Sequence, residues 1–273
     1  MARLPVALAA TLGTTALAVA GGVALLRRQA AHARRRIGKP LGEDAFDADR
    51  VWRRRHEGAV IELLVLGDSI AAGLGADRRK DTLGARLAKG IAAGMRRPVR
   101  LRTAAVVGSE TSALGPQLDA LPSAYRADVA VIVVGGNDIT HRVPVSASAA
   151  GLRAAIVRLR GLGMPVVVGT CPDLGALRPV PQPLRSLGSR MSRQLARAQT
   201  QAAVAEGAWA VSLRHAVGPF FVSNPDEMFS LDRFHPSSAG YRRTAEALLP
   251  SVLAALGADV RLPAGHTPPA SGG

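Results

Sequence analysis

The chain has 273 residues, of which 48% are hydrophobic and only 3% aromatic, and it carries a formal net charge of +15. This length is enough for one sizeable α/β domain with extensions, and the hydrophobic content excludes a mostly disordered protein. The basic excess is mainly arginine scattered along the chain, without interleaved aromatics or a zinc-finger or RNA-recognition signature, so we expect no nucleic-acid partner. A single cysteine, Cys171, excludes an intramolecular disulfide. Without a second cysteine or a close histidine cluster, the sequence predicts neither a metal site nor a cofactor.

The first elements of the chain are an apolar segment and the basic residues that follow it. Residues 4–26 carry no charge and are numerous enough to cross a hydrocarbon core as a helix. We therefore expect a transmembrane or signal helix over residues 1–28, with a surface-lying or buried helix as the alternative. The arginines from Arg27 onward favour a membrane surface as the anionic partner. The chain is then membrane-anchored or exported to the cell envelope; the positive-inside rule favours a cytoplasmic domain, export contradicts it, and the side stays open.

The remaining chain divides by composition into a linker, one domain and a tail. Residues 29–58 are polar and basic and predict a linker, whereas residues 59–258 carry the apolar periodicity of a folded domain. Residues 259–273 are rich in Pro and Gly and are expected to be disordered. The sequence contains no internal repeat, and we expect a monomer.

Within the domain, short apolar runs alternate with longer amphipathic segments. Five runs, bounded by Gly, Pro or polar residues, predict buried strands. They cover residues 61–66, 99–105, 129–134, 165–170 and 209–213. The segments between them, and the one after Ser237, show the one-sided apolar spacing of helices. Alternation of this kind predicts a five-stranded parallel sheet with helices on both faces, and it places the carboxyl ends of the strands at one edge.

A glycine turn and a serine follow the first of these strands. The stretch 61–75 has the sequence IELLVLGDSIAAGLG, in which Gly67 ends the strand and Ser69 lies where a helix begins. The backbone N–H groups at such a position favour an anion. Ser69 is therefore a candidate nucleophile, whose own N–H would help to hold an oxyanion. A serine after a turn is also a common helix N-cap, and this stretch alone leaves both interpretations open.

Three other loops end at the same predicted edge with residues that suit acyl transfer. His235 is an imidazole that can accept the Ser69 proton near neutral pH, and Asp232 can fix its tautomer. The N–H of Gly108 and the side-chain amide of Asn137 would join the N–H of Ser69 as oxyanion donors. These residues, together with the loops that carry them, predict a serine nucleophile, a catalytic triad and an oxyanion hole at one crevice.

The four blocks resemble those of the SGNH hydrolases, the GDSL-type esterase and lipase superfamily. They are GDS ending at Ser69, the glycine Gly108, the sequence GGND around Asn137, and DRFH from Asp232 to His235. The resemblance covers about residues 60–256 and implies that 59–258 is an SGNH domain with a flavodoxin-like three-layer α/β/α sandwich. The overall layout is similar to that of membrane- or wall-associated esterases of actinobacteria.

The resemblance implies a cofactor-free serine esterase that acts on a small acyl-ester substrate. We expect short acyl groups on a lipid or a carbohydrate, because aromatic residues near the predicted site are few. One alternative is an acyltransferase that uses the same site on a glycan or lipid acceptor. The other is a catalytically inactive, membrane-tethered binding protein whose arginines hold an anionic lipid or polymer.

Overall fold

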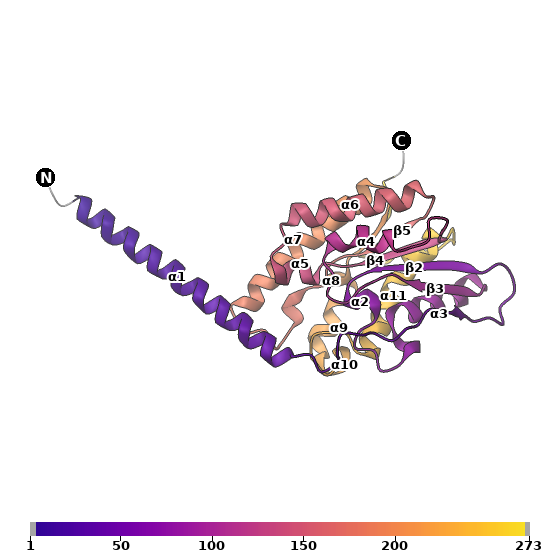
Figure 1. Ribbon diagram of the computed structural model, residues 1–273, viewed down its shortest axis with the longest axis horizontal. Helices are drawn as coiled ribbons and strands as arrows, with labels where there is room; N and C mark the ends of the chain where they lie inside the picture. The colour runs from indigo at the N-terminus through magenta and orange to yellow at the C-terminus, as the bar shows by residue number, and fades with distance from the viewer. Residues whose placement is uncertain (1–3, 271–273) are drawn as a thin grey trace.

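A seven-stranded sheet forms the centre of the protein in the computed structural model, which describes residues 4–270 and the side chains from residue 19 onward (Figure 1). The strand order is β1-β3-β2-β4-β5-β6-β7. The five inner strands are parallel, and β1 and β7 pair antiparallel at the two edges. The strands are β1 (Val51–Trp52), β2 (Ile61–Gly67), β3 (Val99–Thr103), β4 (Val129–Val133), β5 (Val166–Gly169), β6 (Trp209–Val211) and β7 (His266–Thr267).

The parallel strands agree with the sequence prediction, but the sheet is mixed because two short strands were not expected. β1 lies in the predicted linker, where the side chain of Asp49 and the carbonyl of Arg50 accept backbone N–H groups of β3. β7 lies in the predicted disordered tail. It is held there because Ser212 N–H donates to the carbonyl of Gly265 and because Ser251 Oγ lies 2.7 Å from His266 Nδ1. Both strands are fixed by partners distant in sequence.

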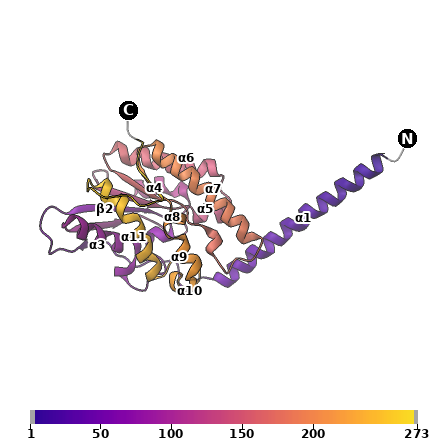
Figure 2. The ribbon, with the colours of Figure 1, turned by 180° about the vertical axis from the view of Figure 1, so that it is seen from behind.

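Helices cover both faces of the sheet, as Figures 1 and 2 show from opposite sides. α3 and α11 pack on one face, and α4, α6 and α7 pack on the other. The α-helices are α1 (Leu4–Ile37), α2 (Ser69–Ala72), α3 (Leu83–Met95), α4 (Leu114–Asp119), α5 (Gly136–His141), α6 (Val145–Gly161), α7 (Leu184–Ala205), α8 (Leu213–Ala216), α9 (Gly218–Ser223), α10 (Pro225–Met228) and α11 (Ser238–Ala255). Three 3₁₀ turns are η1 (Arg79–Asp81), η2 (Thr111–Ala113) and η3 (Leu174–Ala176).

The alternating side chains of β2 show how the sheet divides the core. Leu63 and Val65 are fully buried against α3 and α11, and Leu64 and Leu66 are fully buried on the opposite face. Successive residues of a strand point to opposite faces, so a continuous apolar run is required when both faces are covered. This two-sided burial fixes β2 in the middle of the sheet, with its carboxyl end at the edge where the loops meet.

Helix α1 extends away from the rest of the molecule as a long arm (Figures 1 and 2). Its described side chains include the arginines from Arg27 to Arg36, which interrupt the apolar character of the helix. In the described part of the chain, no helix combines the length and apolarity needed to cross a membrane. The transmembrane segment expected over residues 1–28 is therefore not supported, and the side chains of its first eighteen residues lie outside the described part.

Candidate active site

The turn after β2 places Ser69 at the edge of the sheet. Gly67 has a φ of +133°, and a Cβ at this position would overlap the carbonyl of Val133 on β4, so only glycine fits. Asp68 is the N-cap of α2, because its Oδ1 accepts the N–H of Ile70 at 2.9 Å. Ser69 is thus the first residue of the helix and not its cap. Its hydroxyl is available for another partner.

That partner is His235. Ser69 Oγ lies 2.9 Å from His235 Nε2, and His235 Nδ1 lies 2.5 Å from Asp232 Oδ2. Ser69 and Asp232 are buried, whereas the His235 side chain is 14% exposed. The structure therefore joins the three residues, which come from two distant loops, in one chain of hydrogen bonds.

Asp232 is held in the ionised form that such a chain requires. Burial acts to raise the pKa of Asp232, but hydrogen bonds from the His235 ring and from the backbone N–H groups of Phe234 and His235 outweigh it, so the pKa is lowered. The same tight turn leaves Arg233 with a φ of +55°. An ionised carboxylate on Nδ1 favours the tautomer whose Nε2 can accept a proton from Ser69.

The two predicted oxyanion donors other than Ser69 lie on neighbouring loops. Gly108 follows β3 with a φ of +83°, and open space surrounds the position of its missing Cβ. Asn137 lies in the first turn of α5, and its Nδ2 donates to the carbonyl of Ser109 at 2.9 Å. This hydrogen bond ties the Asn137 amide to the Gly108 loop, and it leaves the second N–H of the amide for another acceptor.

Buried polar side chains brace these loops. Asp138 accepts the N–H of Thr111 at 3.1 Å and the hydroxyl of Ser148 at 2.5 Å. The side-chain amide of Gln117, on α4, accepts from the N–H of Gly67 at 2.9 Å and donates to its carbonyl at 2.7 Å. Asp138, the last residue of the GGND block, thus braces the turn that carries Asn137. Gln117 was not predicted, because nothing in its local sequence links it to the turn after β2.

Asp68 is fully buried below the site. Burial raises the pKa of Asp68, and hydrogen bonds from the backbone N–H groups of Ile70 and Gly135 oppose this rise. The net result is a pKa of about 6. Burial also raises the pKa of Cys171 well above that of a free thiol, which makes this cysteine a poor nucleophile.

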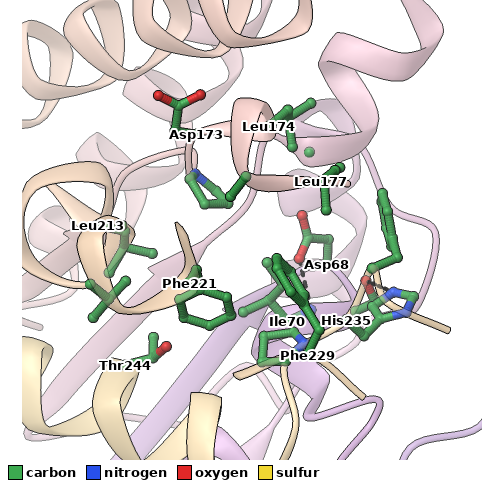
Figure 3. Close-up of a pocket in the computed structure, with 18 of the residues that line it drawn as sticks. Asp68, Ile70, Asp173, Leu174, Leu177, Leu213, Phe221, Phe229, His235 and Thr244 are labelled. Atoms are coloured by element: carbon green, nitrogen blue, oxygen red, sulfur yellow. Dashed lines mark hydrogen bonds between the residues drawn. The ribbon is translucent and has the colours of Figure 1, made fainter. Parts of the chain in front are cut away.

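A pocket opens beside Ser69 and His235, and its walls are mainly apolar (Figure 3). Three of the five phenylalanines of the chain, Phe221, Phe229 and Phe234, contribute to it. The expected scarcity of aromatic residues at the site therefore does not hold. These residues come from α9 and the loop before α11, and no motif marks them in the sequence. In the described part of the chain, no group of three His, Cys, Asp or Glu side chains is arranged to hold a metal ion.

The sheet order and the hydrogen-bonded arrangement of Ser69, His235 and Asp232 agree with the SGNH type that the sequence resembles. Comparison with known families agrees, since the GDSL-like Lipase/Acylhydrolase family matches residues 65–243. A GDSL-like esterase of Mycobacterium tuberculosis is 38% identical to this chain over an alignment of 279 positions, which covers 97% of this chain and 87% of the relative. The chain therefore belongs to the GDSL-like lipase/acylhydrolase family of the SGNH superfamily, and it is a carboxylic ester hydrolase.

Solved structures agree on the fold. A catalytic mutant of an acetylxylan esterase from Geobacillus stearothermophilus has a TM-score of 0.56 at 20% identity, covering 76% of this chain and 99% of its own. An α/β hydrolase enzyme from the metagenome of Lake Arreo has a TM-score of 0.56 at 17% identity, with coverage of 72% and 95%. At these identities the likeness concerns the fold alone.

Proposed function

We propose that this protein hydrolyses carboxylic esters through a Ser69-His235-Asp232 triad and an acyl-enzyme intermediate. The observation that carries the proposal is the continuous hydrogen-bonded chain from Asp232 Oδ2 through the His235 ring to Ser69 Oγ. The apolar pocket that begins at Ser69 gives an ester access to this chain.

In the first half of the reaction, His235 Nε2 takes the proton of Ser69 as Oγ attacks the ester carbonyl carbon. The negative charge on the carbonyl oxygen is stabilised by the N–H groups of Ser69 and Gly108 and by the second amide N–H of Asn137. The carbon–oxygen bond to the alcohol then breaks, and His235 gives the proton to the departing alcohol. Asp232 stabilises the imidazolium throughout.

In the second half, water replaces the alcohol. His235 takes a proton from the water molecule as its oxygen attacks the acyl carbon, and the same donors hold the second oxyanion. The bond to Ser69 Oγ breaks, the proton returns to Ser69, and the carboxylic acid leaves. Atoms and charges balance without a cofactor.

The test compares Ser69→Ala, His235→Ala and Asp232→Asn with the full chain on p-nitrophenyl acetate. We expect kcat to fall at least about a thousandfold in the Ser69 and His235 variants. A fluorophosphonate probe should label the full chain on one residue and leave Ser69→Ala unlabelled. The exposed hydroxyl of Ser223 offers a matched control, Ser223→Ala, which should keep full activity and labelling. Equal activity in Ser69→Ala and the full chain would exclude the mechanism.

A further inference from the structure

The pocket beside Ser69 has a polar end and an apolar end. Asp68, Ser69, Asn137 and His235 lie at the polar end. The remaining wall is formed by side chains from η3, α8, α9 and α11 and by the residues that join them, shown in Figure 3. Among them are Leu174, Leu177, Leu213, Val217, Phe221 and Thr244.

The far wall belongs to the core of the protein. Three of its side chains are at most 8% exposed: Leu213, Val217 and Phe221. They belong to the apolar cluster on the face of the sheet that α3 and α11 cover. Phe221 also packs edge-to-face on Phe229, with ring centroids 4.9 Å apart. The one hydroxyl of this wall that Figure 3 labels, on Thr244, donates to the carbonyl of Gly240 and is thereby satisfied. Asp173 also lines the pocket, and its carboxylate accepts hydrogen bonds from the side chain of Arg214 and from the N–H of Gly175. The side chains of Leu213, Val217 and Phe221 offer a polar ligand group no partner.

The order of the strands gives an estimate of the distance from Ser69 to the far wall of the pocket. Ser69 follows β2 and Leu213 follows β6, and β4 and β5 lie between these strands. Three strand spacings of about 4.8 Å separate the two positions by about 14 Å. An atomic contact distance of about 4 Å at the far wall leaves about 10 Å for a ligand chain. At about 1.2 Å per bond of an extended chain, this distance fits roughly eight bonds.

The chemistry of the reaction decides which half of the ester occupies the pocket. The alcohol must leave and water must enter between the two halves of the reaction, whereas the acyl group stays bonded to Ser69 throughout. A pocket closed by core residues suits the group that stays. The alcohol then lies toward solvent, on the open side of His235.

We propose that this pocket binds a straight, apolar acyl chain of the hexanoyl to octanoyl class, and that acetyl is a poor fit for it. The inference rests on the proposed function, because it assumes that Ser69 carries the acyl group. An acetyl group would leave the contacts with Val217 and Phe221 unmade. Each additional buried methylene is worth about a fourfold gain in binding.

The experiment measures kcat/KM for the full chain on p-nitrophenyl acetate, butanoate, hexanoate, octanoate and dodecanoate. Octanoate has six more methylenes than acetate, so about fourfold for each sets an upper limit of about four-thousandfold on the gain. We expect kcat/KM to rise at least about a hundredfold from acetate to octanoate and to fall again at dodecanoate. Val217→Phe, which fills the far wall, should lower the octanoate-to-acetate ratio at least tenfold. The matched control is Val222→Phe on the outer side of α9, where the side chain is 57% exposed. This control should leave the ratio unchanged.

Phe221→Ala enlarges the pocket, whereas Val217→Phe fills it. Phe221→Ala therefore gives a second test of the inference if Val217→Phe does not fold. It should move the optimum toward longer chains. A parallel series of acetate esters with alkyl alcohols of increasing length should show no comparable rise and no response to Val217→Phe.

The outcomes separate the inference from the proposed function. Hydrolysis that is fastest with acetate, with a ratio that neither variant changes, overturns the inference and leaves the triad intact. A response of the alcohol series in place of the acyl series also overturns it. If the full chain hydrolyses no ester and takes no fluorophosphonate label, the proposed function fails and the inference falls with it.

Discussion

At the scale of single residues, the turn that carries Ser69 is held by a buried glutamine that the motif does not include. Gln117 is 4% exposed and satisfies both the N–H and the carbonyl of Gly67, two residues before Ser69. Its Nε2 also lies 3.3 Å from Ser109 Oγ, on the loop of Gly108. One side chain therefore links the turn that carries Ser69, the proposed nucleophile, to the loop that carries Gly108, a proposed oxyanion donor.

We predict that Gln117→Leu destabilises the protein by about 1–3 kcal/mol, because the buried N–H of Gly67 loses its partner, whereas the carbonyl of Gly67 keeps the N–H of Val106. It should also lower kcat more than it changes KM, because the Gly67 turn shifts Ser69 relative to His235. Urea unfolding and steady-state kinetics give the two quantities. Gln201→Leu makes the same change at an exposed position of α7 and should alter neither. Equal effects of the two variants would contradict the role of Gln117.

Asp68 allows a prediction about pH. Its pKa is raised to about 6 in the folded protein from an ordinary value of 3.8, so the folded state binds the proton more tightly than the unfolded state. The contribution of Asp68 to the free energy of unfolding therefore falls as pH rises from about 4 to about 6, by up to about 3 kcal/mol, and is level above that range. Asn at this position does not titrate. The stability of the full chain minus that of Asp68→Asn should fall across this range; a constant or rising difference would contradict the prediction.

At the scale of elements, the parts predicted from sequence are those with a local pattern. The inner strands are continuous apolar runs that end at Gly or polar residues, and the proposed catalytic residues follow them at the same edge. β1 and β7 have two residues each and carry no periodicity, so only pairing with β3 and β6 makes them strands. The pocket wall was missed for the same reason, because Phe221 and Phe229 reach the site only through tertiary packing.

The role of β7 can be tested by removing the predicted tail, residues 259–273. The shortened chain loses the pairing with β6, the bond from Ser212 to Gly265 and the contact of His266 with Ser251. At about 1 kcal/mol per hydrogen bond, we expect a loss of about 2–4 kcal/mol and a Tm lower by roughly 5–10 °C. Differential scanning calorimetry measures the Tm of each chain. A chain that ends at residue 270 keeps β7 and should melt with the full chain; a disordered tail would make all three chains melt together.

At the scale of the whole molecule, helix α1 and the hydrolase domain share few contacts. Of the side chains that the structure describes, Gln29 provides the hydrogen bonds between them, since its Nε2 donates to the carbonyl of Gln182 and its Oε1 accepts the N–H of Leu184 at 3.0 Å. Among the described side chains, none from α1 belongs to the three apolar clusters of the domain. Ala33 is buried, and Gln29, Ala30 and Ile37 on the same side of the helix are half-buried, whereas the arginines 34–36 are exposed. The fold of the domain thus rests on the sheet and on the helices that cover it.

We therefore predict that a chain beginning at residue 38 folds and hydrolyses esters as the full chain does. Neither the triad nor the pocket wall includes a residue of α1, so kcat/KM should agree within about twofold. The two hydrogen bonds of Gln29 are worth about 1 kcal/mol each, so Tm should fall by no more than roughly 8 °C. Gln29→Ala in the full chain isolates the same contacts and should reproduce that part of the change. Because Gln29 contacts the segment between η3 and α7, a large loss of octanoate hydrolysis in both variants would instead show that α1 shapes the pocket through η3.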